Sequence, residues 1–321
     1  MRRIATAAFV AAIVAAVALS VATASAQDRL KVAIGQMDTW TSQAAILGPR
    51  AGIFAKHGIV LENFGTQGGG ETIQAVISGA ADIGIGIGTV GAMRAFANGA
   101  PIRILAASFT GAGDFYWYVR ADSPIRSLGD ATERHTIAYS TSGSSSHNVV
   151  RAFVEERGLK AKPTATGGQP ATLTQVMSGQ IDMGWAAPPF GLKQIKEGQI
   201  RVVASGNDAA SLRNQTVRVE VVNATVWKDR KDVILRFTRA FREALDWMFT
   251  DPQAAKYYAE AIGATPDMVA ITIEKFQTRA AKQPDVISDI PGIMADGVKF
   301  KFLDKPLTKE QLAELIQIPP K

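Results

Sequence analysis

The sequence predicts an α/β protein of two domains, with parallel-rich sheets flanked by helices and a two-segment hinge between the domains. Three observations lead to this prediction. A length of 321 residues suits two domains of ordinary size. Short β-branched or aromatic runs alternate with longer amphipathic segments, a pattern typical of parallel sheets covered by helices. One sequence pattern also occurs twice along the chain.

The composition excludes several classes of protein. Hydrophobic residues make up 47% and charged residues 20%, which is typical of a folded globular chain. The formal net charge of +6 is spread along the chain, so no nucleic-acid partner is expected. The chain has no cysteine, which excludes disulfides, thiolate metal sites and a lipid-bearing cysteine. We therefore expect a protein that is not a lipoprotein. We also expect it to be a monomer.

Residues 1–26 have the order of features found in a secretory signal peptide. Arg2 and Arg3 precede an Ala-rich apolar run that ends in the small-residue site Ala24-Ser25-Ala26. An uncleaved membrane anchor is the alternative, but the good cleavage site favours removal. We expect the mature protein to be free in the periplasm.

The elements follow in order along the chain. The segments that read as strands are 29–36, 59–65, 103–109, 115–120, 136–141, 200–205 and 217–223. The segments that read as helices are 41–58, 89–99, 147–158, 233–250 and 251–263. Gly58 closes the first helix, and Pro252 suits the first turn of the last one.

The repeated pattern lies in residues 66–84 and 166–184, which read TQGGGETIQAVISGAADIG and TGGQPATLTQVMSGQIDMG. The residues identical at an offset of one hundred are Thr66/Thr166, Gly68/Gly168, Thr72/Thr172, Ser78/Ser178, Gly79/Gly179, Asp82/Asp182 and Gly84/Gly184. Each copy predicts a glycine-bearing loop, a helix, a Ser-Gly stop and a short strand. We interpret the copies as parts of two similar α/β halves, since the period is too long for a solenoid.

The strands at 115–120 and 217–223 read as crossings between the halves. We expect a first domain of residues 28–120 plus 217–321, with the C-terminal helices packed on it, and a second domain of residues 121–216. Two crossing segments form a hinge that can close on a ligand. In open parallel sheets the ligand lies beyond the carboxyl ends of the strands, so the strand-to-helix corners are the candidate site.

The corner SGSSSHN, residues 142–148, carries the strongest site signal. A helix start leaves unpaired N–H groups and about half a positive charge, and the neighbouring hydroxyls add further donors. We expect Ser144, Ser145, Ser146 and His147 to contact a negatively charged group of the ligand. Plain helix capping is the alternative, but one serine would satisfy it.

A serine hydrolase that uses the same corner is the alternative from another class. Neighbouring residues on a helix point about 100° apart, so His147 does not face Ser146. The G-x-S-x-G pattern would need glycine at position 147, and no acidic residue is spaced to orient a histidine. We therefore expect no catalytic residue, no cofactor and no metal site.

Other corners supply weaker candidates. Gly86 to Gly91 matches the dinucleotide-binding pattern G-x-G-x-x-G, but it lies late in the first half and not at the first strand, and an exported chain would meet little NAD. We expect Gly88 and Thr89 to present N–H groups to the cleft instead. Gln36 offers a donor and an acceptor, and Trp40 offers either an apolar wall or a core side chain.

Three further candidates lie near the second half. Trp185 follows the Asp-Met-Gly corner and precedes a proline pair, so it is a plausible wall of the cleft. Gln169 begins the helix of the second copy. Asp114 could meet a cation on the ligand, although such an aspartate more often makes a turn.

With these motifs, the chain resembles the periplasmic binding proteins of ABC importers for nitrate, taurine, alkanesulfonates and thiamine-pyrimidine precursors. The resemblance covers residues 30–250 and is carried by SGAADIGIG, NGAPIRILA, YVRADSPIRSLGDA, TSGSSSHNVVRAFVEERGL and SGQIDMGWAAPPF. It implies a periplasmic-binding-protein-like fold of type II and a ligand held by the corners at Gln36–Trp40, Gly88–Thr89, Ser144–His147 and after Asp182. The family's usual acidic residue or tryptophan in the last loop is replaced by Ala187-Pro188, which bears on ligand identity.

We therefore expect a solute-binding protein that captures a small organic anion, such as a sulfonate or carboxylate, and delivers it to an ABC permease in the inner membrane. A receptor of the same fold for a neutral heteroaromatic, such as a thiamine pyrimidine precursor, is a second alternative. The fold also occurs in eukaryotic pyrimidine synthases that need a cysteine-rich loop, and the absence of cysteine excludes that chemistry.

Overall fold

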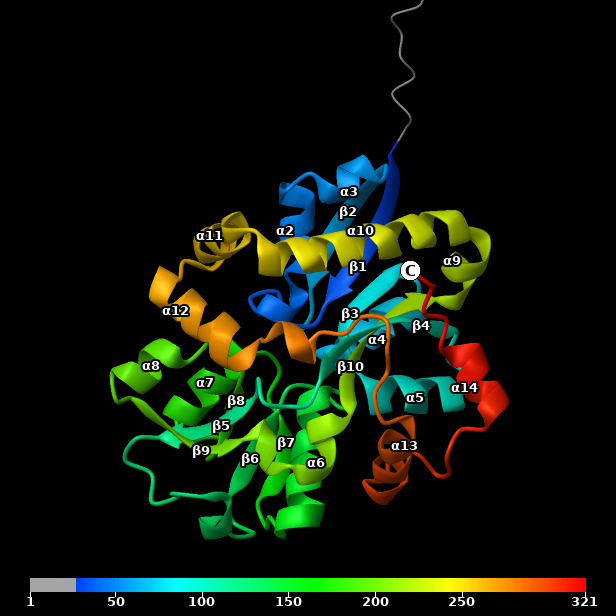
Figure 1. Ribbon diagram of the computed structural model, residues 1–321. Coiled ribbons are helices and arrows are strands. Elements are labelled where there is room, and N and C mark those ends of the chain that lie inside the picture. Colours follow the sequence, from blue (N-terminus) through cyan, green and yellow to red (C-terminus); the bar gives the residue numbers. More distant parts are fainter. Residues whose placement is uncertain (1–26) are drawn as a thin grey trace, which may run out of the picture.

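The computed structural model describes residues 27–321, and the predicted signal peptide lies outside them (Figure 1). The largest sheet has five strands in the order β2-β1-β3-β10-β4. Their bounds are Asp28–Ile34 for β1, Ile59–Gly65 for β2, Ile83–Gly88 for β3, Ile102–Thr110 for β4 and Thr216–Asn223 for β10. Strands β1, β2 and β3 are parallel, and β10 runs antiparallel between β3 and β4.

Two smaller sheets have the orders β8-β5-β9 and β6-β7. Their strands are β5 Tyr116–Arg120, β6 Thr136–Tyr139, β7 Lys162–Ala165, β8 Gly184–Ala186 and β9 Ile200–Ser205. A parallel bridge between Ile137 and Met183 ties β6 to the residue before β8. The joined order β7-β6-β8-β5-β9 repeats that of the large sheet, with β5 antiparallel where β10 is in the first.

Thirteen α-helices flank these sheets in the described part of the chain. They are α2 Ala44–Arg50, α3 Ile53–Lys56, α4 Gly69–Ile77, α5 Thr89–Ala97, α6 Ser145–Arg157, α7 Gln169–Met177, α8 Leu192–Lys196, α9 Ala224–Asp229, α10 Lys231–Thr250, α11 Pro252–Ile262, α12 Pro266–Ile271, α13 Ile290–Lys299 and α14 Lys309–Leu315. We call the elements around the five-stranded sheet the first lobe, and those around the smaller sheets the second lobe; Figure 1 shows the first lobe above the second. The α/β fold with parallel-rich sheets confirms the predicted fold class.

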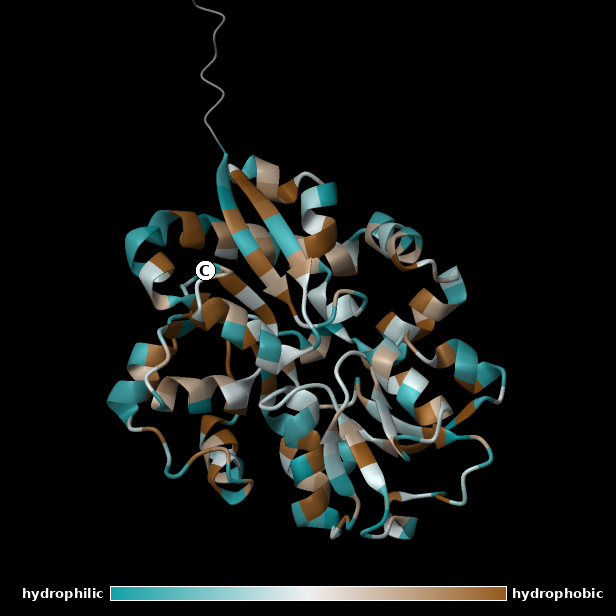
Figure 2. Cartoon of the chain, turned by 180° about the vertical axis from the view of Figure 1, so that it is seen from behind, coloured by the Kyte–Doolittle hydropathy of each residue, from teal (hydrophilic) through white to brown (hydrophobic). Residues whose placement is uncertain are grey.

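Strand alternation gives the large sheet two apolar faces. Leu30, Val32 and Ile34 of β1 pack in a cluster with α2, α3 and α10, while Ala33 points to the other face and packs with α4 and α5. Figure 2 shows hydrophobic residues gathered on the strands and on the helix sides that cover them. The sheet is therefore buried on both sides, as the sequence predicts.

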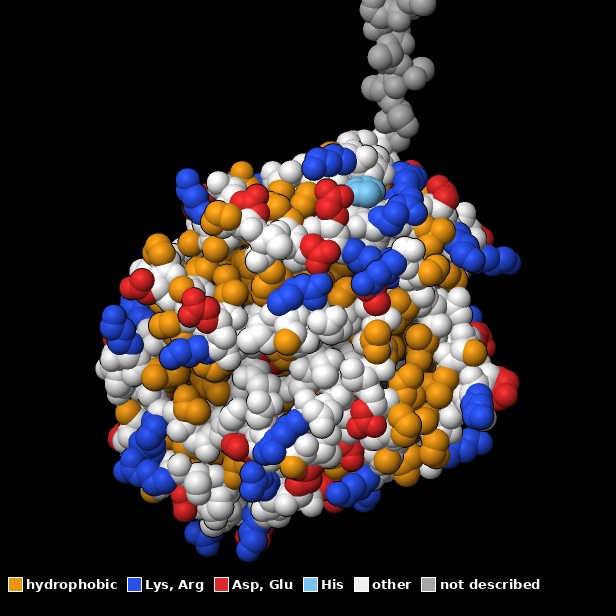
Figure 3. All heavy atoms as spheres, in the orientation of Figure 1, with side chains coloured by type: hydrophobic (Ala, Val, Ile, Leu, Met, Phe, Trp, Pro, Cys, Tyr) orange, Lys and Arg blue, Asp and Glu red, His pale blue; other side chains and the backbone are white. Residues whose placement is uncertain are grey.

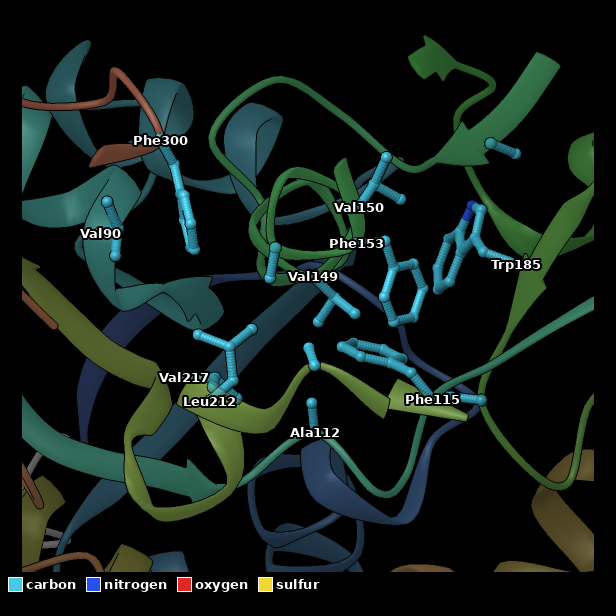
Figure 4. Packing of buried hydrophobic residues seen from close by; sticks show 14 of the residues in the cluster. Val90, Ala112, Phe115, Val149, Val150, Phe153, Trp185, Leu212, Val217 and Phe300 are labelled. Carbon is cyan, nitrogen blue, oxygen red and sulfur yellow. The ribbon is translucent and has the colours of Figure 1, made fainter. Parts of the chain in front are cut away.

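The buried cluster that contains Ala33 continues from the first lobe into the second lobe. Val90 of α5 and Phe300 belong to the same buried cluster as Val149 and Phe153 of α6. Figure 4 shows these side chains in one packed layer with Trp185 and Phe115. The two lobes therefore share part of one hydrophobic core.

Two parts of the chain differ from the sequence prediction. The single helix expected at 41–58 is divided into a short 3-10 helix at Trp40–Ser42, α2 and α3. Gly52, with φ 74°, adopts a left-handed conformation that an α-helix cannot continue through. Strand β5 lies in the range assigned to the first domain but pairs with β8 and β9; the domain boundaries themselves remain a prediction.

The internal repeat is confirmed by matching local structure. Helices α4 and α7 begin and end one hundred residues apart. The hydroxyls of Thr66 and Thr72 lie 2.7 Å apart, and those of Thr166 and Thr172 also lie 2.7 Å apart. The same hydrogen bond therefore fixes the glycine loop to its helix in both copies.

The end of each repeat is anchored in the same way. The Asp82 carboxylate accepts a hydrogen bond from the Lys31 N–H at 2.8 Å, and the Asp182 carboxylate accepts one from the Thr136 N–H at 2.8 Å. Lys31 lies on β1 and Thr136 on β6. Strand β6 therefore takes the place in the second lobe that β1 takes in the first.

Candidate ligand-binding site

A small cavity lies where the strand-to-helix corners of the two lobes meet. Residues of the first lobe and of the segments joining the lobes that line it are Gly35, Gln36, Thr39, Thr41, Ser42, Gly68, Gly69, Gly86, Phe115 and Arg218. Those of the second lobe are Ser140, Ser144, Ser145, Ser146 and Trp185. The starts of helices α4 and α6 thus face one hollow from opposite lobes.

The three serines of the corner have different roles in its structure. The Ser144 hydroxyl caps α6 by accepting the His147 N–H at 3.2 Å. The Ser146 hydroxyl accepts the Ser140 N–H at 3.0 Å and lies 3.0 Å from the Ser144 hydroxyl. Within residues 27–321 the Ser145 hydroxyl has no hydrogen-bond partner, although it lines the cavity. Ser145 is therefore the hydroxyl best placed to bind a ligand.

His147 lies beside the corner but not on the cavity. Its ring stacks on Tyr139 at 4.1 Å and meets Phe302 edge-on at 5.0 Å. Its Nδ1 accepts the Gly143 N–H at 3.2 Å. Burial, together with the positive charges of Arg151 and Arg94, lowers the pKa of His147 to about 4. The neutral ring therefore holds the loop before α6 and does not face the serine hydroxyls.

Arg218 supplies a buried positive charge that the sequence analysis did not identify. It lies on β10, lines the cavity, and donates to Asp114 Oδ2 at 2.5 Å. Its guanidinium lies between the rings of Phe109 and Phe115, 4.5 Å and 4.6 Å from their centroids. Its Nε has no partner among the described residues. The guanidinium is thus fixed with donor capacity left over.

A chain of polar contacts supports Arg218 from below. Asp114 Oδ2 also accepts the Gln277 amide at 3.1 Å, and the Gln277 carbonyl accepts the Thr41 hydroxyl at 2.5 Å. Thr41 itself lines the cavity. Asp114, a predicted ligand contact, is therefore placed one layer behind the cavity, paired with Arg218.

Two further ionisable groups lie near Arg218 in the interior. Burial raises the pKa of Glu220 to about 7, although hydrogen bonds from Ser108 and from the Gly86 N–H oppose the rise. Burial, together with the charge of Arg218, lowers the pKa of Lys282 to about 7. The region below the cavity therefore holds buried groups that titrate near neutral pH.

The first corner presents Gln36 to the cavity and keeps Trp40 away from it. The side-chain carbonyl of Gln36 accepts a hydrogen bond from the side-chain amide of Gln169 at 3.3 Å. The side-chain carbonyl of Gln169 in turn accepts one from the Ala187 N–H at 2.6 Å. Gln169 is thus buried behind Gln36 and does not line the cavity. Trp40 packs on Tyr258 and Phe249 in the first lobe's core, as its alternative interpretation expects.

The aromatic wall comes from Trp185 and Phe115. Both line the cavity, and their ring centroids lie 6.0 Å apart in an edge-on arrangement (Figure 4). The Trp185 Nε1–H has no partner within the described chain. Gly88 and Thr89 are next to the cavity but not on it, because Thr89 donates its hydroxyl proton to the Thr216 carbonyl at 2.6 Å.

The predicted residues that line the cavity are therefore Gln36, Ser144, Ser145, Ser146 and Trp185, and those placed around it are Trp40, Gly88, Thr89, Asp114, His147 and Gln169. The main residue that sequence reasoning missed is Arg218. Its signal was present in the segment VRVEVV, where Arg218 and Glu220 stand on one face of an otherwise apolar strand. Charges inside such a strand indicate a buried, paired site.

Residues 27–321 contain no group of three or more histidine, aspartate or glutamate side chains arranged to hold a metal ion. None of their helices is both long and apolar enough to cross a membrane. Figure 3 shows acidic and basic side chains intermixed over the face in view, without a large patch of one sign.

Comparison with known proteins gives one family. The family model described as NMT1/THI5 like matches residues 42–255. No curated protein matches the sequence.

Solved structures of similar fold are more numerous. The alkanesulfonate-binding protein SsuA from Xanthomonas axonopodis pv. citri, bound to MOPS, has a TM-score of 0.73 at 17% identity, covering 91% of this chain and 98% of that one. The ligand-binding component of an ABC-type import system from Staphylococcus aureus, with zinc bound, has a TM-score of 0.68 at 13% identity, covering 90% and 99%. The periplasmic nitrate-binding protein NrtA from Synechocystis PCC 6803 has a TM-score of 0.67 at 12% identity, covering 89% and 84%.

Proposed function

Since this chain belongs to the NMT1/THI5-like family and has the fold of periplasmic binding proteins, we propose that it is an extracytoplasmic solute-binding protein. It captures a small organic anion in the cavity between its lobes and delivers it to an ABC permease. The solved proteins of the same fold, named for binding sulfonate or nitrate and for ABC-type import, support this role. In the proposed cycle the mature protein is a periplasmic monomer without residues 1–26.

The observation that supports an anionic ligand is the buried guanidinium of Arg218, which lines the cavity. The starts of α4 and α6 add the positive ends of two helix dipoles on the same cavity. The unpaired donors Arg218 Nε and Trp185 Nε1, together with the Ser145 hydroxyl on the cavity, offer hydrogen bonds that a carboxylate or sulfonate accepts. A buried donor that stays unpaired is costly, so a ligand oxyanion relieves that cost.

Binding without chemical change is proposed because the corner lacks an activated nucleophile. The His147 ring is held by Gly143 and by two aromatic rings. A serine needs a base within hydrogen-bond reach to attack a substrate. The ligand is therefore held by Ser145 and Arg218 and released intact.

A neutral heteroaromatic ligand is the second candidate. The aromatic walls Phe115 and Trp185 would suit such a ring. An uncharged ring would leave Arg218 with Asp114 alone. The anion is preferred for that reason.

Thermal unfolding with a ligand panel tests the proposal. The panel contains MOPS, taurine, benzoate, nitrate and an aminopyrimidine. A ligand at one hundred times its Kd stabilises the folded state by about 2.7 kcal/mol, which raises Tm. We expect at least one anion to raise Tm while the aminopyrimidine does not. A panel in which no compound changes Tm would contradict the transport role, and a response to the aminopyrimidine alone would favour the second candidate.

The variant Ser145→Ala localises the site. Loss of one hydroxyl that contacts a buried charge should weaken binding by about 1–3 kcal/mol, while the ligand-free Tm stays near that of the wild type. Ser178→Ala, at an exposed helix end, is the matched control and should bind normally. Equal affinities for the two variants would place the ligand elsewhere.

A further inference from the structure

Around the cavity the two lobes contact each other through main-chain atoms and glycine residues. Residues 140–143 of the second lobe lie on Gly70 of α4 and on Gly88 and Gly91 of the α5 region. A Cβ at Gly88 would come 2.6 Å from the Gly143 carbonyl oxygen, inside the 3.0 Å that real Cβ contacts keep. A Cβ at Gly91 or Gly70 would come still closer, to the carbonyl oxygens of Gly143 and Ser142 respectively.

Hydrogen bonds between the lobes continue this contact along the cavity. The Gly70 N–H donates to the Thr141 hydroxyl at 2.9 Å, and the Gly168 N–H donates to the side-chain carbonyl oxygen of Gln67 at 3.1 Å. Gln67 and Gly168 belong to the two copies of the internal repeat, so the glycine loop of one copy holds that of the other. We call residues 67–70, 88 and 91 together with 140–143 and 168 the closing seam.

The closing seam is continuous with the cavity. Gly68 and Gly69 on one side, and Ser140 on the other, belong to both. The Ser144 N–H donates to the Thr141 carbonyl at 3.1 Å, so the position of Thr141 fixes the start of α6. The docking of residues 140–143 therefore sets where Ser145 stands relative to Arg218.

The sequence of the helices gives independent support. Gly70 and Gly91 lie inside α4 and α5, where glycine is less favourable than alanine. Neither residue has the left-handed backbone conformation that would require glycine. The close approach of the second-lobe backbone is thus the reason that the structure supplies for glycine at both positions.

We infer that Gly70 and Gly91 are positioning residues for ligand binding, which act by letting the backbone of residues 140–143 dock and close the cavity. This inference rests on the proposed function, since closure matters only if a ligand is captured. Neither glycine lines the cavity, so their effect on affinity passes through the seam.

The test compares Gly70→Ala and Gly91→Ala with a matched control. Gly129→Ala is the control, because the nearest atom to its Cβ would be the Ser127 hydroxyl at 3.6 Å and its φ is not positive. We expect both seam variants to bind the best ligand of the panel, or MOPS if several respond, at least tenfold more weakly than wild type. Their ligand-free Tm should equal or exceed that of the wild type, because alanine favours the helix.

Lobe closure itself can be measured because the chain has no cysteine. Ser78→Cys and Ser178→Cys place spin labels at equivalent exposed helix ends in the two lobes. We expect the Gly91→Ala background to give longer label distances than the wild-type and Gly129→Ala backgrounds. Unchanged distances and affinity in both seam variants would overturn the inference, as would a loss of ligand-free Tm, which would make the contact part of the fold.

Failure of the seam and failure of the proposed function give different results. If the wild type binds no compound of the panel, the proposed function fails. The ligand-free label distances of wild type and Gly91→Ala still decide whether the seam controls closure. Normal wild-type binding with unaltered seam variants overturns the seam alone.

Discussion

The role of Arg218 depends on where the fold places its side chain. Its strand returns from the second lobe and inserts between β3 and β4, which brings the guanidinium beside Asp114, more than one hundred residues away in the chain. Removing either partner would leave an uncompensated buried charge. The pair therefore explains how the guanidinium is held at the cavity floor, and it supports the proposal of an anionic ligand.

The serines and Trp185 of the site could be predicted, whereas Arg218 could not be placed. A strand followed by serines and a helix identifies a corner from local pattern alone. The partner of Arg218 and the face on which it opens depend on the strand order, which a single sequence does not contain. For the same reason Trp40, equally plausible as wall or core, is a core residue only because α10 and α11 cover it.

His147 gives a pH-dependent prediction. Its pKa is about 4 in the folded protein and 6.5 when unperturbed, so between these values the unfolded chain binds a proton that the folded chain does not. The free energy of unfolding should therefore fall as pH falls from 6.5 to 4, by up to about 3 kcal/mol from this group. Well above pH 6.5 the group contributes no pH dependence, because both states are then deprotonated. Urea unfolding at pH 7, 5.5 and 4.5 measures the change.

The comparison for this prediction is His147→Gln, which cannot take up the proton. Its stability should fall less steeply over the same pH range than that of wild type. If His147→Gln and wild type lose stability in parallel, the buried imidazole is not the cause.

At the scale of elements, the repeat was predictable and the break in the first helix was not. The repeat follows from gapless identities that recur in the same hydrogen bonds of α4 and α7. The break at Gly52 depends on whether glycine is placed inside a helix or ends it, and a single sequence allows both. Glycine at 70 and 91 continues a helix, while glycine at 52 stops one.

The matching threonines predict equal energetic roles for the two copies. Thr72→Val and Thr172→Val each remove a hydroxyl that contacts another threonine and a glycine carbonyl. Each should lower the free energy of unfolding by about 1–3 kcal/mol, because the partner hydroxyl is left unpaired. Urea unfolding measures both. A loss at one position only would mean that the copies share geometry but not energetics.

At the scale of the molecule, the fold class was predictable because strand and helix periodicities and the repeat agree. The exchange of β5 and β10 between the lobes could be predicted only in part. Their sequences indicate that both strands cross between the lobes, but not which sheet each strand joins. Pairing decides it: β5 joins β8 and β9, and β10 joins β3 and β4. Each lobe thus receives its antiparallel strand at the end of a connection from the other.

The shared core predicts how the whole molecule unfolds. Because Val90 and Phe300 belong to the same buried cluster as Val149 and Phe153, neither lobe can unfold without exposing part of the other's core. We expect one calorimetric transition, with the calorimetric enthalpy equal to the van't Hoff enthalpy. Two separate peaks would show that the lobes unfold independently.

The glycine contacts between the lobes have a practical consequence for engineering. Under the proposed function, guest recognition depends on a few replaceable side chains, whereas the inferred movement depends on glycines and main-chain contacts that lie apart from those side chains. Selectivity could therefore be redesigned at Ser145, Gln36 or Trp185 without rebuilding the motion. A fluorescent sensor built on this scaffold could be retuned to new analytes while its optical response is retained.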